Sequence, residues 1–419
     1  MTSKPSVAPA AKKQGRLRRG VGMTNEEMRH VGGLSGIFAL RLLGLFLVLP
    51  VLSIYALGLR GATPFLAGLA VGFYGLAQTG MQLPFGMLSD RFGRKPVIVA
   101  GLLIYVVGSV VAALSHGIYG LLLGRFMQGM GAIASVLLAL IADLTREEVR
   151  GRAMAFVGIS IGLSFTLGFV LGPILAARHG VPFLFWILAG LDSFAVFYLL
   201  TFIPTCPPKR AAAVKLKDLG VDLGDRNLVC LDGVMFLLHL GLTAIWVVTP
   251  AILLQHWDRH DIWRVYLPMI LLAGFIMLPA MGFAEAKQRL RTLLAAGLLL
   301  AGAGFLILAL APGRPLAAAG GLIVYFIGFN LMEPCLPSLV SRFAPEDLRG
   351  SAMGLFNMSQ FMGAFCGGAL GGFALGHGRY VLYWMLLAAC LPWAWLASRV
   401  EAPPRRKPAQ DLEADIAAA

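Results

Sequence analysis

The sequence predicts an all-α membrane protein in which twelve transmembrane helices form two pseudo-symmetric six-helix bundles. Three observations support this fold class: the composition, the length of the apolar runs and an internal repeat. Of the 419 residues, 58% are hydrophobic and 13% are charged, and the mean hydropathy is +0.78. A soluble chain of this length needs more charged residues to cover its surface. The main solvent of this chain is therefore lipid.

Twelve apolar runs are long enough to cross a bilayer, which takes about 20 mostly apolar residues. They cover residues 33–58, 64–88, 96–115, 118–142, 152–176, 182–204, 228–255, 262–284, 291–311, 315–341, 351–376 and 379–398. The longest interruption is basic and separates six runs from six. We therefore expect the following order: an arm (1–30), a first bundle (31–204), a central loop (205–227), a second bundle (228–398) and a disordered tail (399–419).

Lys and Arg predict the orientation, because these residues accumulate on the cytosolic side of a membrane. If the first helix begins in the cytosol, only six of the 35 basic residues lie on the opposite side: Arg60, Arg178, Arg259, Arg264, Arg314 and Arg379. Both termini are then cytosolic. The basic arm lacks the apolar core of a signal peptide and suits a surface of anionic lipid headgroups.

An internal repeat links the two predicted bundles. Residues 150–154, RGRAM, recur as RGSAM at residues 349–353, and residues 86–95 have a degraded counterpart at residues 282–291. The two offsets are nearly equal, which indicates two parallel structural repeats. Transporters that work by alternating access are built from such repeats.

Other classes of protein are not favoured. The net charge of +14 does not come from a basic helix interleaved with stacking aromatic residues, so we expect no nucleic-acid partner. The five cysteines show no CxxC spacing, which argues against a metal site and disulfides. They are Cys206, Cys230, Cys335, Cys366 and Cys390. The seven histidines form neither an HExxH pattern nor a Ser–His–Asp pattern. We expect no enzyme and no cofactor.

Five charged residues fall within the apolar runs, where insertion of a charge costs about 2.5–3.5 kcal/mol. They are Arg41, Arg125, Asp192, Asp232 and Glu333. Glu333 is the best candidate for a proton carrier, because burial disfavours its charged form. Pro334 beside it frees backbone groups, as expected of a helix that lines a cavity. The alternative is a Glu bonded permanently to a neighbouring helix.

The other four charged residues have less specific interpretations. For Asp192 we favour a structural hydrogen bond over proton transfer, and Asp232 lies near enough to a helix end to be solvated. Arg41 and Arg125, with Gln128 one turn after Arg125, could set the local potential, contact substrate or tie helices together. His239 could titrate near neutral pH, although a lone membrane histidine is more often only hydrogen-bonded.

Aromatic and amide side chains in the apolar runs predict a mostly apolar cavity, which suits hydrophobic or amphipathic ligands. We expect Phe38, Tyr55, Tyr74, Gln78, Phe165, Trp246, Asn330, Asn357 and Gln360 to line it. A sugar site would need more carboxylates and amides, and a phosphate site would need convergent Arg and Lys. The alternative for each aromatic residue is packing against lipid or another helix.

Three motifs resemble those of the major facilitator superfamily. Residues 86–96, GMLSDRFGRKP, resemble its signature loop almost completely, and residues 124–131, GRFMQGMG, resemble its second motif. Residues 168–173, GFVLGP, are similar to the antiporter motif of the drug-efflux branch through Gly168, Gly172 and Pro173. The trailing Gly pair of that motif is Ala176 and Ala177 here, a departure that weakens the antiporter assignment.

The likeness extends through the membrane region to the YajR-like bacterial transporters, above all at residues 41–50, 124–155 and 330–372. Those transporters have a small cytosolic domain after the last helix. This sequence has only a short tail from Glu401, so we expect no regulation through such a domain.

The resemblance implies a function and a site. The function is a monomeric, proton-driven antiporter of a bacterial inner membrane that exports hydrophobic or amphipathic small molecules. A symporter or uniporter for a metabolite or lipid is the alternative. Glu333 would lie on a helix that lines the cavity, whereas the helix of Asp192 would pack outside it.

The resemblance also implies a conformational latch in the signature loop, formed by Gly86, Asp90, Arg91, Gly93, Arg94 and Asp143. Gly86 would allow close helix approach, and Asp90 would face the positive start of the eleventh helix near Ser351. Arg94 would pair with Asp143, and together these contacts would hold the outward-open state. The alternative is a solvated turn whose charges only set the topology.

Overall fold

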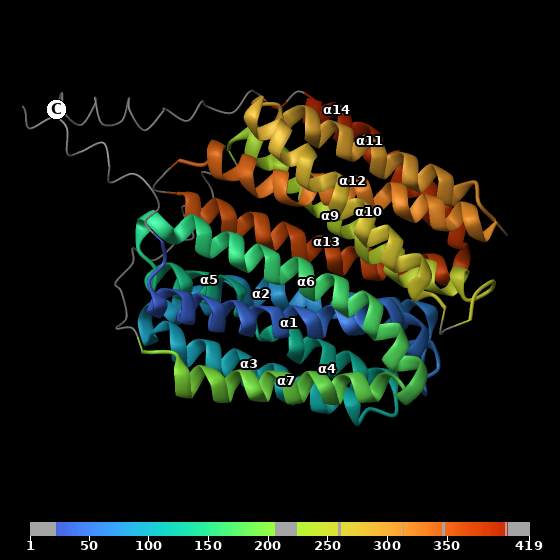
Figure 1. Cartoon of the computed structure of the whole chain (residues 1–419). Coiled ribbons are helices and arrows are strands. Elements are labelled where there is room, and N and C mark those ends of the chain that lie inside the picture. Colours follow the sequence, from blue (N-terminus) through green and yellow to red (C-terminus); the bar gives the residue numbers. More distant parts are fainter. Residues whose placement is uncertain are drawn as a thin grey trace, which may run out of the picture.

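The structure is a computed structural model that describes residues 22–205, 224–258, 261–312, 314–345, 348–398 and 400. Most of the expected arm, central loop and tail lies outside these residues. The described part folds into helices that run side by side in two groups (Figure 1). Its only β pairing is an isolated bridge between Arg60 and Gly117.

The first half holds α1 (Asn25–Leu57), α2 (Pro64–Phe92), α3 (Arg94–Ala113), α4 (Ile118–Met130), α5 (Ala134–Asp143), α6 (Glu147–His179) and α7 (Val181–Phe202). The second half holds α9 (Arg226–Leu253), α10 (Trp263–Ala286), α11 (Leu290–Ala309), α12 (Pro315–Phe343), α13 (Arg349–His377) and α14 (Arg379–Ser398). With α4 and α5 taken together, the described residues contain twelve helical segments, each close to one predicted run.

Nine of these segments in the described chain are long and apolar enough to cross a membrane. For α2, α13 and α14 a crossing stays a prediction. Successive helices run in opposite directions, so the helix termini gather at two opposite ends of the molecule. We call them the Asp90 end, where α1 begins and α2 ends, and the Tyr55 end, where α1 ends and α2 begins.

The predicted fourth helix is interrupted at residues 131–133, between α4 and α5. The Arg41 Nη2 group of α1 donates to the carbonyl oxygens of Gln128 at 3.0 Å and Gly131 at 2.9 Å. Non-helical backbone inside a membrane protein needs such substitute partners. A Cβ at Gly131 would lie 2.4 Å from the Gly101 carbonyl oxygen, so α3 also requires a glycine at the break.

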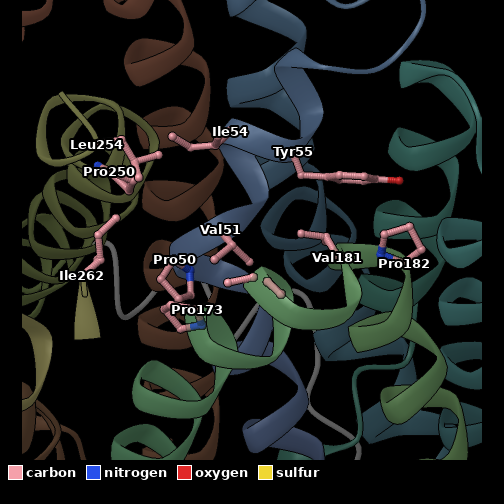
Figure 2. A pocket seen from close by; sticks show the side chains of 13 residues that line it. Pro50, Val51, Ile54, Tyr55, Pro173, Val181, Pro182, Pro250, Leu254 and Ile262 are labelled. Carbon is pink, nitrogen blue, oxygen red and sulfur yellow. The ribbon is translucent and has the colours of Figure 1, made fainter. Parts of the chain in front are cut away.

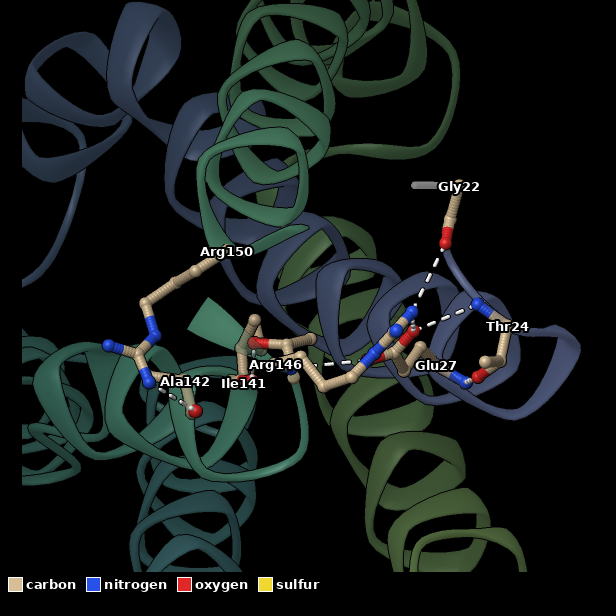
Figure 3. A network of polar contacts seen from close by, with 8 residues as sticks. Gly22, Thr24, Glu27, Ile141, Ala142, Arg146 and Arg150 are labelled. Carbon is tan, nitrogen blue, oxygen red and sulfur yellow. Dashed lines mark hydrogen bonds and ion pairs between the residues drawn. The ribbon is translucent and has the colours of Figure 1, made fainter. Parts of the chain in front are cut away.

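The start of α1 is anchored to the start of α6, and α1 begins earlier than predicted. Thr24 and Glu27 form a capping box, which extends the helix back to Asn25. The Glu27 carboxylate also accepts from Arg146 Nε at 2.9 Å and Nη2 at 3.0 Å (Figure 3). This ion pair holds two helices of the first half together at the Asp90 end.

Glycines bring α2 and α13 into backbone contact near the Tyr55 end. A Cβ at Gly68 would lie 2.3 Å from the Gly368 carbonyl oxygen, and one at Gly75 would lie 2.5 Å from that of Phe361. On its other face, α13 meets α9 in the same way, because a Cβ at Gly363 would lie 2.2 Å from the Phe236 carbonyl oxygen. Small residues permit such approach between membrane helices. Thus α13 joins the two halves.

The same two helices pack less closely toward the Asp90 end. A Cβ at Gly86 would meet nothing within 4 Å, and one at Gly354 of α13 would meet only the Leu83 side chain of α2, at 3.6 Å. A cavity of about 180 Å³ lies here between α2, α5 and α13. Its lining is Gln82, Leu83, Gly86, Met87, Asp90, Ser135, Gly350, Met353, Gly354 and Asn357. The two halves therefore meet backbone to backbone near the Tyr55 end, and they meet through side chains around a small cavity at this part of the Asp90 end.

We expect Gly68→Ala to lower the stability of the folded protein by about 1–3 kcal/mol, because the new methyl group meets backbone that cannot move aside. Gly80→Ala is the matched control on the same helix, where the exchange should be neutral or stabilising by up to about 1 kcal/mol. Thermal unfolding of both variants in the same detergent measures the difference. Equal Tm values for Gly68→Ala and Gly80→Ala would contradict the close contact.

Candidate functional site

Glu333 lies in a polar cluster contributed by three helices of the second half. Its Oε2 atom is 3.9 Å from Nε2 of His239, which belongs to α9. The same histidine nitrogen is 2.8 Å from Nε2 of Gln360, which belongs to α13. Sequence analysis named all three residues but did not predict that they meet. The sequence suggested that His239 is an isolated membrane histidine, whereas the structure places a carboxylate and an amide beside it.

This cluster places a carboxylate beside an imidazole and an amide. The Glu333 side chain is 37% exposed, whereas that of His239 is 10% exposed. Glu333 Oε2 and His239 Nδ1 have no hydrogen-bond partner among the described residues. The unpartnered Oε2 atom is itself buried, and the alternative of a permanent bond to a neighbouring helix stays a prediction for Glu333. Its expected role as proton carrier is compatible with this geometry.

The two other acidic candidates lie elsewhere. Asp232 is half-buried on α9, two turns before His239. Asp192 is fully buried on α7, and neither carboxylate oxygen has a hydrogen-bond partner among the described residues. The structural hydrogen bond that we favoured for Asp192 is thus not among its described contacts. Arg41 is a nearby cation on α1 whose field reaches Asp192.

A buried network surrounds Arg125 in the first half. The guanidinium donates from Nε to the Ala70 carbonyl oxygen at 3.2 Å and from Nη1 to Gln128 Oε1 at 2.8 Å. Gln128 Nε2 then donates to Ser109 Oγ at 2.8 Å. Arg125, Gln128 and Ser109 are all fully buried. These contacts join α4 to α2 and α3, as the interpretation of Arg125 as a tie between helices would require.

Arg41 extends this network to the break between α4 and α5. Its guanidinium stacks on the Tyr105 ring at 3.5 Å from the centroid, and it also lies 5.8 Å from the Tyr74 ring. Cation–π contacts of this kind gain strength when they are desolvated. Sequence analysis missed Tyr105 and Ser109, because a tyrosine or serine in an apolar run carries no signal of its partner.

The residues predicted to line one cavity are distributed over several places. Trp246 is buried and Phe165 half-buried in aromatic packing, Phe38 is buried in the core, and Tyr74 packs on the two arginines. Gln78 is buried, and Asn330 donates to the Phe326 carbonyl oxygen on its own helix at 2.9 Å. Asn357 lines the cavity between α2 and α13, and Tyr55 lines a pocket at the opposite end.

The residues of the antiporter motif pack α6 against α1. A Cβ at Gly168 would lie 2.5 Å from Phe46 Cβ, and one at Gly172 would lie 2.2 Å from the Leu47 carbonyl oxygen. Pro173 follows inside the helix and borders the pocket at the Tyr55 end. The motif therefore sets the distance between two helices of the first half.

The signature loop has the geometry that the resemblance implies within the first half. Arg94 forms an ion pair with Asp90, and its Nε lies 3.6 Å from Asp143 Oδ2. Gly93 has a φ of 95°, a backbone region that favours glycine. Asp90 lines the same cavity as Gly350 at the start of α13. Its predicted contact with that helix start across the halves remains a prediction.

One functional contact of this loop was not anticipated. Lys95 Nζ donates to the carbonyl oxygens of Ile203 at 2.6 Å and Leu200 at 3.1 Å, at the end of α7. A cation stabilises the carbonyl end of a helix. In the sequence Lys95 gave only a topology signal, because its acceptor is more than a hundred residues away.

The fold and its buried charges define a polytopic membrane transporter, and comparison with known proteins places it in a family. The family model described as Major Facilitator Superfamily matches residues 34–368 and 233–418. The chain belongs to this superfamily. It is 38% identical over 390 residues to the inner membrane transport protein YajR of Escherichia coli (strain K12), covering 91% of this chain and 85% of that protein. Its family and this relative are transporters and not enzymes, as the sequence predicted.

More distant relatives share the same region. The multidrug resistance protein MdtH of Aeromonas salmonicida (strain A449) is 26% identical and covers 83% of this chain and 88% of its own. Among solved structures, the nucleoside transporter NupG aligns with a TM-score of 0.70 at 14% identity, over 90% of this chain and 99% of that chain. That structural likeness supports the fold alone.

We expect Arg41→Met to destabilise the protein by about 1–3 kcal/mol, because the carbonyl groups of Gln128 and Gly131 lose their buried donor. If Asp192 also interacts with Arg41, adding Asp192→Asn should recover part of that loss, so that the two changes are not additive. Equilibrium unfolding in mixed micelles of the wild type, both single variants and the double variant gives the coupling. Strictly additive losses would show that the two charges do not interact.

Proposed function

We propose that this transporter is a proton-coupled antiporter that exports hydrophobic or amphipathic small molecules across a bacterial inner membrane by alternating access. The observation on which the proposal chiefly rests is the cluster of Glu333, His239 and Gln360. A carboxylate on α12 faces a titratable ring on α9 and an amide on α13, with one oxygen still free. Intramembrane ionisable residues that face the interior of a bundle are typical of proton relays.

The coupling follows from electrostatics. When Glu333 is ionised, its charge must be solvated or paired, and His239 is an ionisable group on a neighbouring helix at 3.9 Å. When Glu333 is protonated, that demand disappears, and Gln360 can hydrogen-bond with His239 alone. Because Gln360 belongs to α13, which also contacts α2, the proton state can bias how the two halves meet. Protonation and substrate binding then compete for one state of the transporter.

The conformation fits the loading step of an exporter. If the Asp90 end faces the cytosol, the closest contact between α2 and α13 lies on the outer side, and the small cavity between them lies on the inner side. Asp90 already pairs with Arg94, so only its interaction with the start of α13 has to form when this side closes. In this proposal the latch residues stabilise the opposite, outward-open state.

The substrate class rests on the apolar character of the interior and on relatives. Aromatic residues of both halves pack between α6, α9, α10 and α12, as in the contact of Phe165 with Phe326 at 6.4 Å between ring centroids. Among the relatives, MdtH is named a multidrug resistance protein. An interior with few charged groups favours ligands that need little polar recognition.

Glu333→Gln should abolish efflux driven by a pH gradient while it preserves exchange of substrate across the membrane without a gradient. Glutamine keeps the size of the side chain and is uncharged like a protonated glutamate, but it cannot release a proton. Asp232→Asn is the matched control, a carboxylate on α9 outside the cluster, and it should keep gradient-driven efflux within about twofold, well below the tenfold that 1.4 kcal/mol represents. The measurement is uptake of dyes and antibiotics by proteoliposomes. Full gradient-driven transport by Glu333→Gln would refute the carrier assignment.

The direction in which protons move distinguishes an antiporter from the alternative, a symporter. Proteoliposomes that contain a pH-sensitive dye and no imposed gradient receive a transported compound from outside. An antiporter removes protons from the lumen as substrate enters, so the lumen becomes more alkaline. A symporter would acidify it, and a uniporter would leave it unchanged. Acidification would favour the import of a metabolite over drug export.

A further inference from the structure

The two ends of the fold hold cavities of different chemistry. In the pocket at the Tyr55 end, Tyr55 supplies the only polar side chain of the lining (Figure 2). The cavity of about 180 Å³ at the Asp90 end is lined instead by one carboxylate, two amides and one hydroxyl, which belong to Asp90, Gln82, Asn357 and Ser135. The proton cluster and the latch give no role to the two amides and the hydroxyl.

The cavity at the Asp90 end is open because three glycines line it. A Cβ at Gly86 of α2 or at Gly350 of α13 would meet nothing within 4 Å, and one at Gly354 of α13 would meet only the Leu83 side chain. Larger residues at these positions would occupy the space. Because α2 and α5 belong to the first half and α13 to the second, a molecule in this cavity contacts both halves.

The polar side chains lie at two levels of this cavity. Gln82 precedes Asp90 by eight residues in α2, which places it about 12 Å deeper along the helix axis. Asn357 follows Gly350 by seven residues in α13, about 10 Å deeper. Ser135 lies in the first turn of α5, which runs from the break toward the Asp90 end. The carboxylate is therefore at the shallow end of the cavity, and the amides and the hydroxyl are at its deep end.

The deep end holds polar atoms that have no partner. Gln82 is 5% exposed, and its Oε1 atom has no hydrogen-bond partner among the described residues. The same is true of Ser135 Oγ. Both residues line the cavity, and the Gln82 amide can turn toward it because a terminal sp³–sp² torsion is broad. A buried polar group without a partner is costly, and a ligand with a hydrogen-bond donor at this level removes that cost.

The shallow end holds the only charged side chain of the lining. Asp90 is partly exposed, and no Lys, Arg or His is among the described residues that line the cavity. Its ion-pair partner Arg94 also lies 3.6 Å from Asp143, so two carboxylates share one guanidinium. A cavity with one carboxylate and no basic side chain attracts cations and repels anions. The larger side chains between the two levels are apolar: Leu83, Met87 and Met353.

We propose that this cavity is the loading site for the exported molecule, and that it selects amphipathic cations with an ammonium group and a hydrogen-bond donor at opposite ends of a short apolar body. The ammonium group lies against Asp90, and the donor reaches Gln82 and Ser135 at the deep end. The apolar body lies between α2 and α13. This proposal rests on the proposed export function, and it narrows the substrate class from hydrophobic or amphipathic molecules to cations.

Three single-ring compounds test the two ends of the cavity separately. Tyramine carries an ammonium group and a phenol hydroxyl, phenethylamine lacks the hydroxyl, and 4-ethylphenol lacks the ammonium group. Binding to the purified full-length protein is measured by equilibrium dialysis against protein-free micelles of the same detergent, which corrects for partition. Tyramine should bind at least about fivefold more tightly than either of the other two compounds. Equal binding of all three would overturn the proposed selectivity.

Gly86→Leu tests the location of the site. The new side chain fills the cavity, and it should weaken tyramine binding by about tenfold or more. Gly80→Leu is the matched control at an exposed position of the same helix, where a Cβ would also meet nothing within 4 Å. This control should keep the affinity within about twofold of the wild type. Unchanged tyramine binding by Gly86→Leu would overturn the site itself.

Asp90→Asn and Gln82→Leu test the two polar contacts. Asp90→Asn should weaken tyramine and phenethylamine binding about fivefold and leave 4-ethylphenol binding within about twofold. Gln82→Leu should weaken tyramine and 4-ethylphenol binding about fivefold and leave phenethylamine binding within about twofold. A change of conformation through the latch would move all three affinities together, and that result would overturn the assigned contacts.

A lipid headgroup with a primary ammonium is another source of the same chemistry. Phosphatidylethanolamine carries this group, whereas the quaternary ammonium of phosphatidylcholine has no N–H donor. Addition of either lipid to the micelles should leave tyramine binding within about twofold. Displacement of tyramine by phosphatidylethanolamine alone would assign the site to the lipid and overturn its role in loading.

The Glu333→Gln variant separates this proposal from the export proposal. Glu333 lies in the cluster with His239 and does not border the cavity. Tyramine binding to Glu333→Gln should therefore match the wild type even where gradient-driven efflux is lost. Efflux of dyes by a wild type that fails to bind tyramine would refute the loading site alone. Tyramine binding by a wild type that exports nothing would refute export and leave only the cation site.

Discussion

The contact between α2 and α13 holds the two halves in the observed arrangement. At Gly68 and Gly368 the helices meet backbone to backbone, closer than any side chain would allow. Membrane helices gain little from the hydrophobic effect when they associate, so close packing of small residues carries much of the attraction. Such a surface has few side chains to interlock, and it can open at one end while it remains closed at the other.

One helix links this contact to the ionisable cluster. Gln360 of α13 reaches His239, and two turns later Gly368 lies against α2. In the proposed mechanism, a change in the charge of Glu333 therefore acts on the helix that determines how the halves meet. That mechanism needs only a short mechanical route from proton to conformation and no long chain of coupled residues.

The two halves treat buried charge in different ways. In the first half, Arg41 and Arg125 are buried and donate to backbone carbonyls, amides and aromatic faces. These contacts stabilise an interrupted helix and a close-packed bundle. In the second half, Glu333 retains exposure and a free oxygen. The first half also holds Asp192, which is fully buried with no hydrogen-bond partner for either carboxylate oxygen among the described residues. The arginine contacts therefore suit a structural role, and the proposed proton site differs from Asp192 in its partial exposure.

The sequence by itself determined the membrane class, the two-part organisation and nearly every helix boundary, because these depend on run length and on local charge. It also identified the signature loop, Glu333 and the motif glycines by residue type and spacing. Only the tertiary structure decided which residues meet. His239 lies beside Glu333, and Lys95 donates to carbonyl oxygens at the end of α7. Arg41 donates to the break in the fourth helical segment, a segment that the apolar pattern had predicted to be continuous. The residues predicted to line one cavity lie in several different places for the same reason. Contacts between residues far apart in the chain depend on helix rotation and on glycine-mediated approach, neither of which is encoded in a local pattern of apolar residues.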